Sequence, residues 1–288
     1  MNTLKNILFL ILLPFLVQSQ VSSLKVMTLN ARYNNPDDGP YSWVNRKSMF
    51  FDMIQQVNPD VIGFQETLIS QVLDLQEAFP GYSWVGAGRD DGKQAGEFAP
   101  IFFNARRFEQ KATGTFWLSE TPDKPGSRSW NAACNRIVTW IKLSDLESHQ
   151  LFFVFNTHFD HASAEARIQS ARLINSTIKK IAGKCWVIVT GDFNDTEGSE
   201  MYEILTDTLQ KNTLTNTSRI STAKPDGPSY TYIGFPFHPE EGNTIDFIFT
   251  KNSQSVKVVS HQVLTYNHEG KYPSDHLPVY ATFELKKK

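Results

Sequence analysis

The sequence predicts an α/β domain in which helices lie on the faces of β-sheets. Short runs rich in β-branched and aromatic residues alternate with longer amphipathic segments. Several of these runs are apolar throughout, which is typical of strands buried on both faces. We find no internal repeat, low-complexity block or long linker, so we expect one continuous domain over residues 24–285.

Strands are expected where a short run of β-forming residues is bounded by polar or turn residues. In chain order, these runs cover residues 24–29, 61–64, 99–103, 137–143, 151–155, 186–189, 245–250 and 279–285.

Helices are expected where apolar residues recur every three or four positions. Residues 47–57 and 164–182 show this spacing, and each helix needs a sheet to cover. Residues 207–241 are richer in Thr, Ser, Pro and aromatic residues, which predicts long surface loops carrying short elements.

The N-terminus has the layout of a signal peptide, which we assign to residues 1–20. A short basic start is followed by the apolar residues 6–17, which Pro14 interrupts, and then by a polar stretch. The apolar run is shorter than the roughly 20 residues that span a bilayer, so we expect no transmembrane anchor after cleavage. The alternative is a retained anchor. We expect an exported protein, periplasmic or extracellular, that is monomeric and has no stable protein partner.

The charge balance excludes a globally basic surface. The 288 residues include 28 Lys and Arg against 30 Asp and Glu, a net charge of −2. A polyanionic substrate would therefore need a local basic patch. Arg89, Lys93, Arg128 and Arg136 could form such a patch, although each is also an ordinary solvated surface residue.

Loop aromatics offer a second kind of contact surface. Trp43, Trp130, Phe235 and Phe237 fall outside the predicted elements. They could stack on bases or sugars, or they could pack loops onto the body of the domain.

Several other chemistries lack their motifs. No Gly-x-Ser-x-Gly occurs, and the glycine-rich residues 86–92 lead into a strand rather than a helix, which excludes a nucleotide-binding loop. Zinc motifs are absent, and residues 33–39 read as a turn. Cys134 and Cys185 could form one bridge, but we expect them to be buried apolar residues.

Polar side chains follow four of the predicted strands. Asn30, Glu66, His158 and the pair Asp192 and Asn194 stand where these strands end. Ligand sites are built at such edges because the loops converge there while the strands hold them rigid. Asn and Asp also begin ordinary turns, yet four strands ending this way favour a site.

Asp192 and Asn194 are two residues apart. If the strand geometry continues to Asn194, both side chains project from one face and Phe193 packs on the other. A carboxylate beside an amide suits the activation of a water molecule and the binding of the oxygen that it attacks.

Further carboxylates and imidazoles are available near the C-terminus. Asp246 opens one strand, and Asp275 and His276 precede another. A carboxylate that bonds an imidazole nitrogen favours the protonated ring, which could hold a phosphate oxygen. The sequence leaves the pairing of His158 and His276 with these carboxylates open. Glu66 is the best candidate ligand for a hard cation such as Mg²⁺.

Four short motifs carry a resemblance to a known family. They are QET at 65–67, GDFN at 191–194, IDFIF at 245–249 and SDH at 274–276. In this order, they resemble the endonuclease/exonuclease/phosphatase superfamily, which has the DNase I-like fold, and the chain looks like a secreted bacterial branch. The resemblance implies a four-layered α/β sandwich with two mixed β-sheets packed face to face and helices outside. It also implies hydrolysis of a phosphoester.

The resemblance implies a Mg²⁺ or Mn²⁺ cofactor. Glu66 matches the principal metal ligand of the family. Asn30 matches a residue beside the metal and the phosphate, and Asp275 a residue near the metal or its waters.

The resemblance also implies catalytic roles. Asp192 matches the base that activates water, and Asn194 the amide that steadies it. His276 matches a residue that holds a phosphate oxygen and is oriented by Asp246.

Three further residues match phosphate-side positions. His158 would contact the phosphate or leaving group, Glu97 would orient that histidine, and Arg136 would approach the phosphate. One departure is Ala95, which stands where some nuclease members carry a tyrosine.

The resemblance leaves the substrate open between a phosphodiester and a phosphomonoester. A secreted nuclease acting on DNA or RNA and a sphingomyelinase-like phospholipase are alternatives, and residues 232–237 could form the hydrophobic hairpin that the latter needs. A non-catalytic binding module would be expected to lack one of the residues Glu66, Asp192, Asn194 or His276, and all are present.

Overall fold

The computed structural model describes residues 21–207, 213–235, 243–251 and 256–286. The predicted signal peptide and Phe237 lie outside the described residues. Within them, the strands form two six-stranded mixed sheets. The resulting α/β sandwich with helices on its faces confirms the predicted fold class.

The first sheet has the order β11-β12-β1-β2-β4-β3. Only β1 and β2 are parallel neighbours in it. The bounds are β1 (Val21–Asn30), β2 (Val61–Gln65), β3 (Tyr82–Val85), β4 (Ile101–Asn104), β11 (Val256–Val263) and β12 (Val279–Lys286).

The second sheet has the order β5-β6-β7-β8-β10-β9, with β7 and β8 as its parallel pair. The bounds are β5 (Phe108–Trp117), β6 (Ile137–Asp145), β7 (Leu151–His158), β8 (Trp186–Asp192), β9 (Thr215–Asn216) and β10 (Asp246–Lys251).

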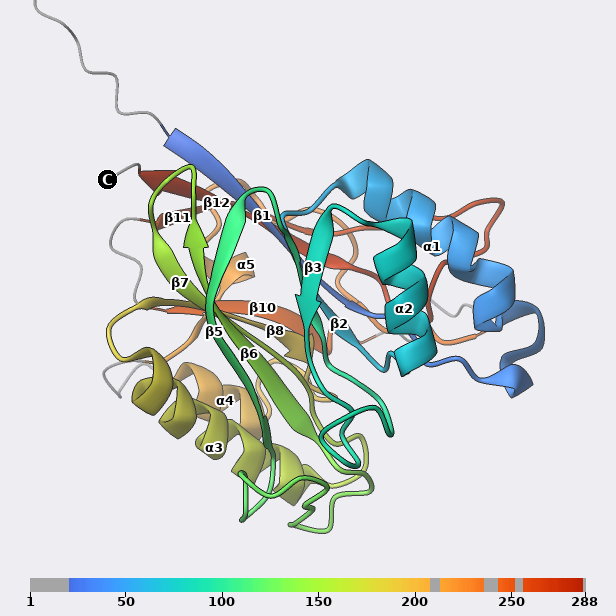
Figure 1. The fold of residues 1–288 in the computed structure, drawn as a ribbon, viewed down its shortest axis with the longest axis horizontal. Helices are drawn as coiled ribbons and strands as arrows, with labels where there is room; N and C mark the ends of the chain where they lie inside the picture. Colours follow the sequence, from blue (N-terminus) through green and yellow to red (C-terminus); the bar gives the residue numbers. More distant parts are fainter. Residues whose placement is uncertain (1–20, 208–212, 236–242, 252–255, 287–288) are drawn as a thin grey trace, which may run out of the picture.

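Helices cover the two outer faces, so the molecule has four layers (Figure 1). The first sheet carries α1 (Trp43–Val57) and α2 (Ile69–Ala78), and the second carries α3 (Ala164–Ala182) and α4 (Glu200–Thr206). A 3₁₀ helix, η1 (Pro36–Tyr41), and the short α5 (Thr217–Ile220) lie in the connections. No helix among the described ranges is long and apolar enough to cross a bilayer.

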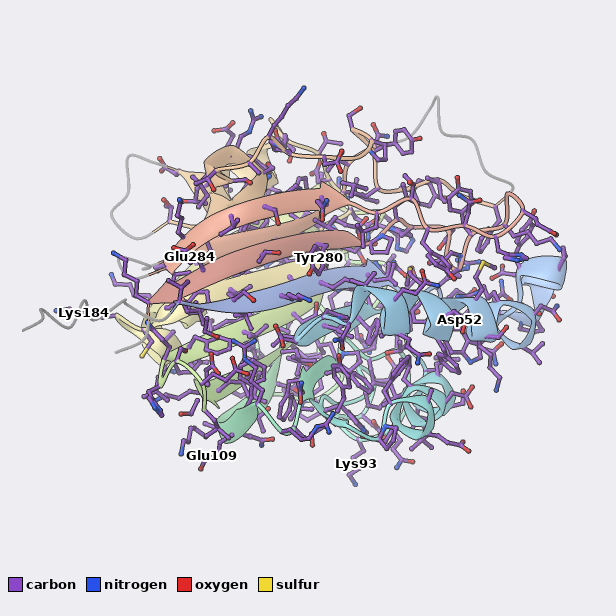
Figure 2. All side chains as sticks on the ribbon, turned by 90° about the horizontal axis from the view of Figure 1, so that it is seen from above. Asp52, Lys93, Glu109, Lys184, Tyr280 and Glu284 are labelled. Atoms are coloured by element: carbon purple, nitrogen blue, oxygen red, sulfur yellow. The ribbon has the colours of Figure 1, made fainter. Side chains whose placement is uncertain are left out.

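The main core lies between the sheets, and strand alternation builds it. On β12, Ala281, Phe283 and Leu285 are buried in this core. Tyr280 and Glu284 are on the outer face of the same strand (Figure 2). Because successive residues of a strand point to opposite faces, β12 contributes to the inner core and to the layer under the helices.

A polar contact joins the two sheets inside this core. Gln65 Nε2 donates to Asn156 Oδ1 at 2.7 Å, and Asn156 Nδ2 donates to the carbonyl of Phe64 at 2.6 Å. Thr190 Oγ1 also donates to Asn156 Oδ1 at 2.9 Å. Gly63 permits the close approach, because a Cβ atom there would lie 2.2 Å from Thr190 Oγ1.

Four strands that the sequence did not predict, β3, β5, β9 and β11, are the four edge strands of the sheets. Much of β5 is exposed, with buried residues only at its ends. The helices α2 and α4 were not predicted either, and α1 begins before residue 47.

Some expectations about single residues were wrong. Trp43 is buried in α1 and is not a loop aromatic. Cys134 and Cys185 are partly exposed rather than buried, and no disulfide joins them. The second half of the expected turn, residues 36–39, belongs to η1 (Pro36–Tyr41), which the Asn35 side chain caps.

Candidate active site

A cleft of about 460 Å³ opens where the ends of strands from both sheets meet. Most of the predicted site residues line it: Glu66, Arg89, Glu97, Arg136, His158, Asp192, Asn194, Asp275 and His276. Asn30 and Asp246 are fully or almost fully buried and contact the lining residues from behind.

Strand register explains why these residues converge. In the parallel pair β1 and β2, Asn30 pairs with Gln65, so Glu66 follows directly at the same edge. In the second sheet, Asp192 pairs with His158 on one side and with Asp246 on the other.

Asn30 connects the two halves of the cleft. Its Nδ2 donates to Glu66 Oε1 and to Asp192 Oδ2, both at 2.9 Å. Its Oδ1 accepts from the backbone N–H of Arg32 at 2.9 Å. With every amide group of Asn30 engaged, the separation of the two carboxylates is fixed by one buried side chain.

Glu66 adopts a left-handed backbone with a φ of 61°, which is uncommon for a non-glycine residue. This turn directs its side chain into the cleft immediately after the strand ends. The backbone N–H of Tyr33 donates to Glu66 Oε2 at 3.2 Å.

Asp192 is buried and lies beside two imidazoles. Its Oδ2 is 3.5 Å from His158 Nε2 and 3.8 Å from His276 Nε2. Burial and the charge of Asp246 raise the pKa of Asp192 to about 7, against the opposing effect of His276. A carboxylate with a pKa near neutrality is suited to proton transfer at physiological pH.

His276 and Asp246 form a buried ion pair. His276 Nδ1 lies 2.9 Å from Asp246 Oδ2. Burial lowers the pKa of His276, but the adjacent Asp246 carboxylate, together with those of Asp192 and Asp275, outweighs burial and raises it to about 10. The ring is therefore protonated at neutral pH, and its Nε2–H is available to a ligand.

His158 is neutral, because burial and the charges of Arg136 and Arg89 hold its pKa well below the usual range. Asn194 Nδ2 lies 2.9 Å from His158 Nε2, which makes Nε2 the acceptor and places the proton on Nδ1. That Nδ1 is 3.9 Å from Glu97 Oε2, beyond a hydrogen bond.

The backbone at Asn194 differs from the extended strand that the sequence predicted. The strand does not continue to Asn194, whose φ is 51°. Asn194 contacts Asp192 through its backbone N–H, at 2.9 Å from Oδ1, while its side-chain amide also donates to the carbonyl of Phe159. Phe193 packs in the core as expected.

Two arginines, Arg89 and Arg136, line the cleft. Arg89 Nη1 donates to Glu97 Oε2 at 2.6 Å, and Arg136 Nε lies 3.4 Å from Asp160 Oδ2. Arg89 Nε and Arg136 Nη1 are buried without a hydrogen-bond partner among the described residues. Lys93 is exposed and Arg128 bonds the carbonyl of Ala133, so neither lines the cleft.

Sequence reasoning missed three residues of the site. Arg32 lies 3.9 Å from Asp275 Oδ2 and lines the cleft. Arg46, on α1, donates to the carbonyls of Tyr41, Arg32 and Pro273. The Tyr232 ring meets His276 edge-on at 5.0 Å. Of these three residues, only Arg32 could have been found from its position, because it lies two residues after Asn30 at the end of a predicted strand.

The acidic residues of the cleft suit a hard divalent cation. Ligand atoms of Glu66, His158 and Asp192 lie within 4.8 Å of one another. Glu66 and Asp192 supply the one or two carboxylates that typically hold Mg²⁺ in a phosphate site. Asp275, a predicted ligand, is not part of this group.

The aromatic residues in loops differ in what they contact and in whether they lie at the cleft. Phe235 stacks on Tyr41, with ring centroids 4.6 Å apart. Tyr232 is 43% exposed at the cleft, whereas Trp130 is partly exposed in a loop outside the cleft lining.

Comparison with solved structures finds close relatives of this arrangement. An endonuclease/exonuclease/phosphatase from Bacteroides vulgatus is 39% identical, with a TM-score of 0.86 over 92% of this chain and 99% of that chain. A mannosyl-6-phosphatase from Bacteroides thetaiotaomicron is 33% identical, with a TM-score of 0.81 over 90% of this chain and 99% of that chain.

A curated viral protein also matches over most of its length. The uncharacterized protein L388 of Acanthamoeba polyphaga mimivirus is 26% identical over 91% of this chain and 100% of its own. The model of the endonuclease/exonuclease/phosphatase family matches residues 27–276, from the first strand to the predicted phosphate-binding histidine. The chain belongs to the endonuclease/exonuclease/phosphatase family.

Proposed function

We propose that this protein is a Mg²⁺- or Mn²⁺-dependent hydrolase that cleaves a phosphoester by in-line attack of an activated water, and that its substrate is a small phosphorylated sugar. The observation that carries the proposal is the position of Asp192. This buried carboxylate, with a pKa near 7, lies between a candidate cation ligand, Glu66, and a protonated imidazole, His276.

Glu66 would hold the cation, and Asn30, which bonds both carboxylates, would keep Glu66 at a fixed separation from Asp192. When bound, the cation would offset the charge of the substrate phosphate. Arg32 is paired with Asp38 through two hydrogen bonds and lies 3.9 Å from Asp275 Oδ2, so its positive charge faces that carboxylate in the cleft.

Asp192 would accept the proton of the attacking water. The Asn194 backbone N–H and the Asn30 amide each bond one of its oxygens, which orients the carboxylate. His276 would donate its Nε2–H to a non-bridging phosphate oxygen, and the unpartnered N–H groups of Arg89 and Arg136 would bind further oxygens. These donors are in place before substrate arrives, so little reorganisation accompanies the reaction.

Three observations support a small phosphorylated sugar. The cleft volume of about 460 Å³ is that of a small-molecule site. The net charge of −2 disfavours a long polyanion. The 33% identical relative from Bacteroides thetaiotaomicron is a mannosyl-6-phosphatase.

The phospholipase alternative needs an exposed apolar hairpin over residues 232–237. In the described part of this segment, Tyr232 contacts His276 and Phe235 stacks on Tyr41. These contacts favour a role for the segment as the rim of the catalytic cleft, beside a bound sugar ring, over a role as a hairpin that inserts into a membrane. Export remains part of the proposal, since residues 1–20 have a signal-peptide layout.

The proposal is tested by a substrate panel. Purified protein is assayed with sugar phosphates, inositol phosphates, sphingomyelin, RNA and DNA, each with Mg²⁺, Mn²⁺ or EDTA. We expect phosphate release from sugar phosphates in the presence of metal only. Hydrolysis that persists in EDTA would refute the metal requirement, and cleavage confined to nucleic acids would refute the substrate class.

A further inference from the structure

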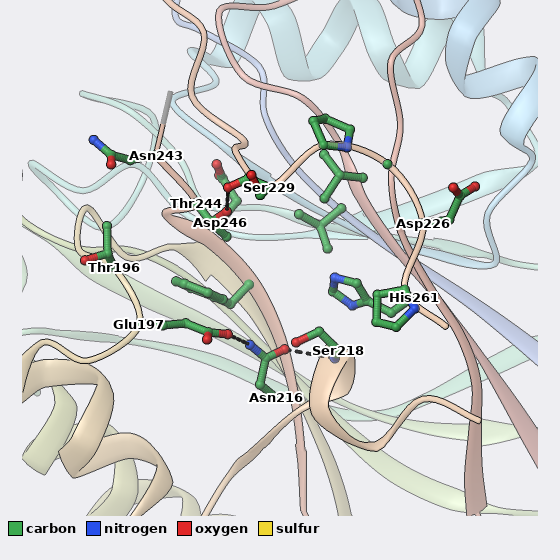
Figure 3. Close-up of a pocket in the computed structure, with 16 residues that line it drawn as sticks. Thr196, Glu197, Asn216, Ser218, Asp226, Ser229, Asn243, Thr244, Asp246 and His261 are labelled. Atoms are coloured by element: carbon green, nitrogen blue, oxygen red, sulfur yellow. Dashed lines mark hydrogen bonds between the residues drawn. The ribbon is translucent and has the colours of Figure 1, made fainter. Parts of the chain in front are cut away.

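A second pocket, of about 550 Å³, lies on the other side of the segment that carries Asp246 (Figure 3). Ile245 lines the catalytic cleft, whereas Thr244 and Asp246 line this pocket. The volume is within the roughly 300–1,000 Å³ of small-molecule sites. The proposed hydrolysis does not use it.

The walls of the pocket come from five separate parts of the chain. In Figure 3, Glu197, Asn216 and Ser218 lie on one side, Ser229 and Thr244 face them, and Asp226 and His261 form a third side. The floor is apolar, formed by Phe247, Val263 and Val279.

His261 presents a hydrogen-bond acceptor to this pocket. Its side chain is 8% exposed, and burial lowers its pKa to about 4, so the ring is neutral. Thr217 Oγ1 donates its hydrogen to the carbonyl of Ile248 and must therefore accept from His261 Nδ1 at 2.9 Å. The remaining nitrogen, Nε2, is an acceptor without a partner among the described residues.

The charges of the pocket favour an uncharged ligand. Its described lining contains no Lys or Arg, which disfavours a phosphate or carboxylate. Glu197 is paired with Arg219 and Asp246 with His276, so the lining has little unpaired negative charge. Among the described residues, Asp246 clusters only with Asp192 and His276 of the active site, and neither Glu197 nor Asp226 belongs to a carboxylate cluster, which disfavours a metal in this pocket.

The remaining polar groups match hydroxyls. Asp226 and His261 Nε2 require donors, whereas the side chains of Ser218, Ser229 and Asn243 can donate or accept. A hydroxyl group supplies both functions, and the C–H face of a sugar ring fits an apolar floor.

We propose that this pocket binds an uncharged saccharide, with His261 Nε2 accepting a sugar hydroxyl. The saccharide could be a free ligand or a second ring of a phosphorylated glycan that reaches across the Asp246 segment. Both sources present the same chemistry to the pocket.

Binding is measured by saturation-transfer NMR with methyl α-mannoside, methyl α-glucoside and mannobiose, in EDTA. We expect saturation transfer with the wild-type protein and its loss in Ser229→Trp, which fills the pocket. Tyr232→Ala alters the catalytic cleft instead and should leave the signal unchanged. Absence of transfer for all three sugars, or an unchanged signal in Ser229→Trp, would overturn the proposal.

Two variants test His261 itself. His261→Leu should weaken saccharide binding by roughly tenfold, and His261→Gln, which retains an acceptor, should weaken it less. Circular dichroism and the melting temperature verify that both variants are folded. If a folded His261→Leu binds as tightly as the wild type, His261 does not contact the sugar.

A kinetic experiment, which rests on the proposed function, distinguishes a free saccharide ligand from a second ring of the substrate. KM is compared for mannose 6-phosphate and phosphorylated mannobiose in wild type and Ser229→Trp. A rise in KM confined to the disaccharide assigns the pocket to a second substrate ring. If KM is unchanged for both substrates in Ser229→Trp while binding of the free sugars is lost, the pocket is assigned to a separate ligand. The EDTA binding data stand even if neither compound is hydrolysed.

Discussion

The two sheets contribute to the active site through the same local design but with different chemistry. Each contains one parallel strand pair that ends at the cleft, β1 with β2 and β7 with β8. After each pair the chain adopts a left-handed backbone, at Arg32 and Glu66 in the first half and at Asn194 in the second. The first sheet presents the Asn30 amide and the Glu66 carboxylate, and the second presents the His158 imidazole. His276 leads into β12 of the first sheet but bonds Asp246 of the second.

The side chains of the cleft suit two separate tasks, cation binding and contact with protons and phosphate. The oxygen atoms of Asn30 and Glu66 suit a hard cation, and the imidazoles of His158 and His276 suit proton and phosphate contacts. Asp192 belongs to the second sheet but bonds Asn30 of the first. The comparison therefore predicts that variants in each half will fail differently, and that Asp192 will affect both.

Asp192→Asn is expected to have the largest effect. Loss of the base should lower kcat by about 10²–10⁴-fold, because the amide cannot accept a proton. The measurement is steady-state hydrolysis of the best substrate in the panel, with the melting temperature as the control for folding. Full activity in this variant would remove Asp192 from the role of base.

Glu66→Gln tests the first half alone. Removal of the ligand charge should weaken Mn²⁺ binding by at least about 10²-fold, as measured by calorimetry. The matched control is His276→Asn, at the imidazole that is paired with Asp246 of the second sheet, which should lower kcat while leaving Mn²⁺ affinity near that of the wild type. Equal losses of affinity in the two variants would contradict the separation of tasks.

Asp246→Asn tests the second half. Without the Asp246 carboxylate, burial dominates and the pKa of His276 falls from about 10. The imidazolium is then lost as pH rises through the lowered pKa, so activity at pH 8 should drop by tenfold to about 10²-fold relative to wild type. NMR titration of His276 measures the pKa directly, and an unchanged value would refute the role of Asp246.

Asp160→Asn addresses the stability of the second half. Burial opposes ionisation of Asp160, but backbone N–H groups of Ser163 and Ala133, with Arg136, lower its pKa to about 2. The folded-state pKa is below the unfolded one, so the stabilisation is present above about pH 4 and is lost as pH falls toward 2. The variant should lose about 2 kcal/mol of unfolding free energy at pH 7.

Urea denaturation at pH 7 and pH 3 provides the measurement for Asp160→Asn. The difference between variant and wild type should narrow at the lower pH. A constant difference would mean that the carboxylate charge does not supply the stabilisation.

Tyr232→Ala is expected to have the smallest effect. Loss of the ring beside His276 should raise KM roughly two- to tenfold, with little change in kcat, if the ring packs on the substrate's sugar. Tyr232→Phe keeps the ring and should behave like wild type. A change confined to kcat would assign Tyr232 to the positioning of His276 instead.

The central strands could be predicted because burial on both faces leaves a continuous apolar run, as in β8. The four edge strands could not, since each pairs on one side only and is partly solvated. In β5, polar and small residues fill the middle of the strand, so neither alternation nor an apolar run marks it.

The residues of the candidate site could likewise be predicted only where a local sequence pattern marks them. Asn30, Glu66, His158 and Asp192 stand directly at strand ends, where sequence position alone indicates a site. Arg46 lies within a helix, and its three carbonyl partners belong to loops that only the tertiary fold brings to it. No local pattern could indicate that role.

The pairing of β12 with β1 has a consequence for the order in which activity arises during synthesis. Thr28 pairs with Val279, and Ser274 donates to the carbonyl of Asn30 at 2.6 Å, so the segment bearing His276 docks beside the first strand. A chain is made from its N-terminus, so this docking awaits nearly the last residues of the domain. A nascent chain that has not reached His276 lacks the imidazole that we propose as the hydrogen-bond donor to the phosphate, and we expect it to be inactive.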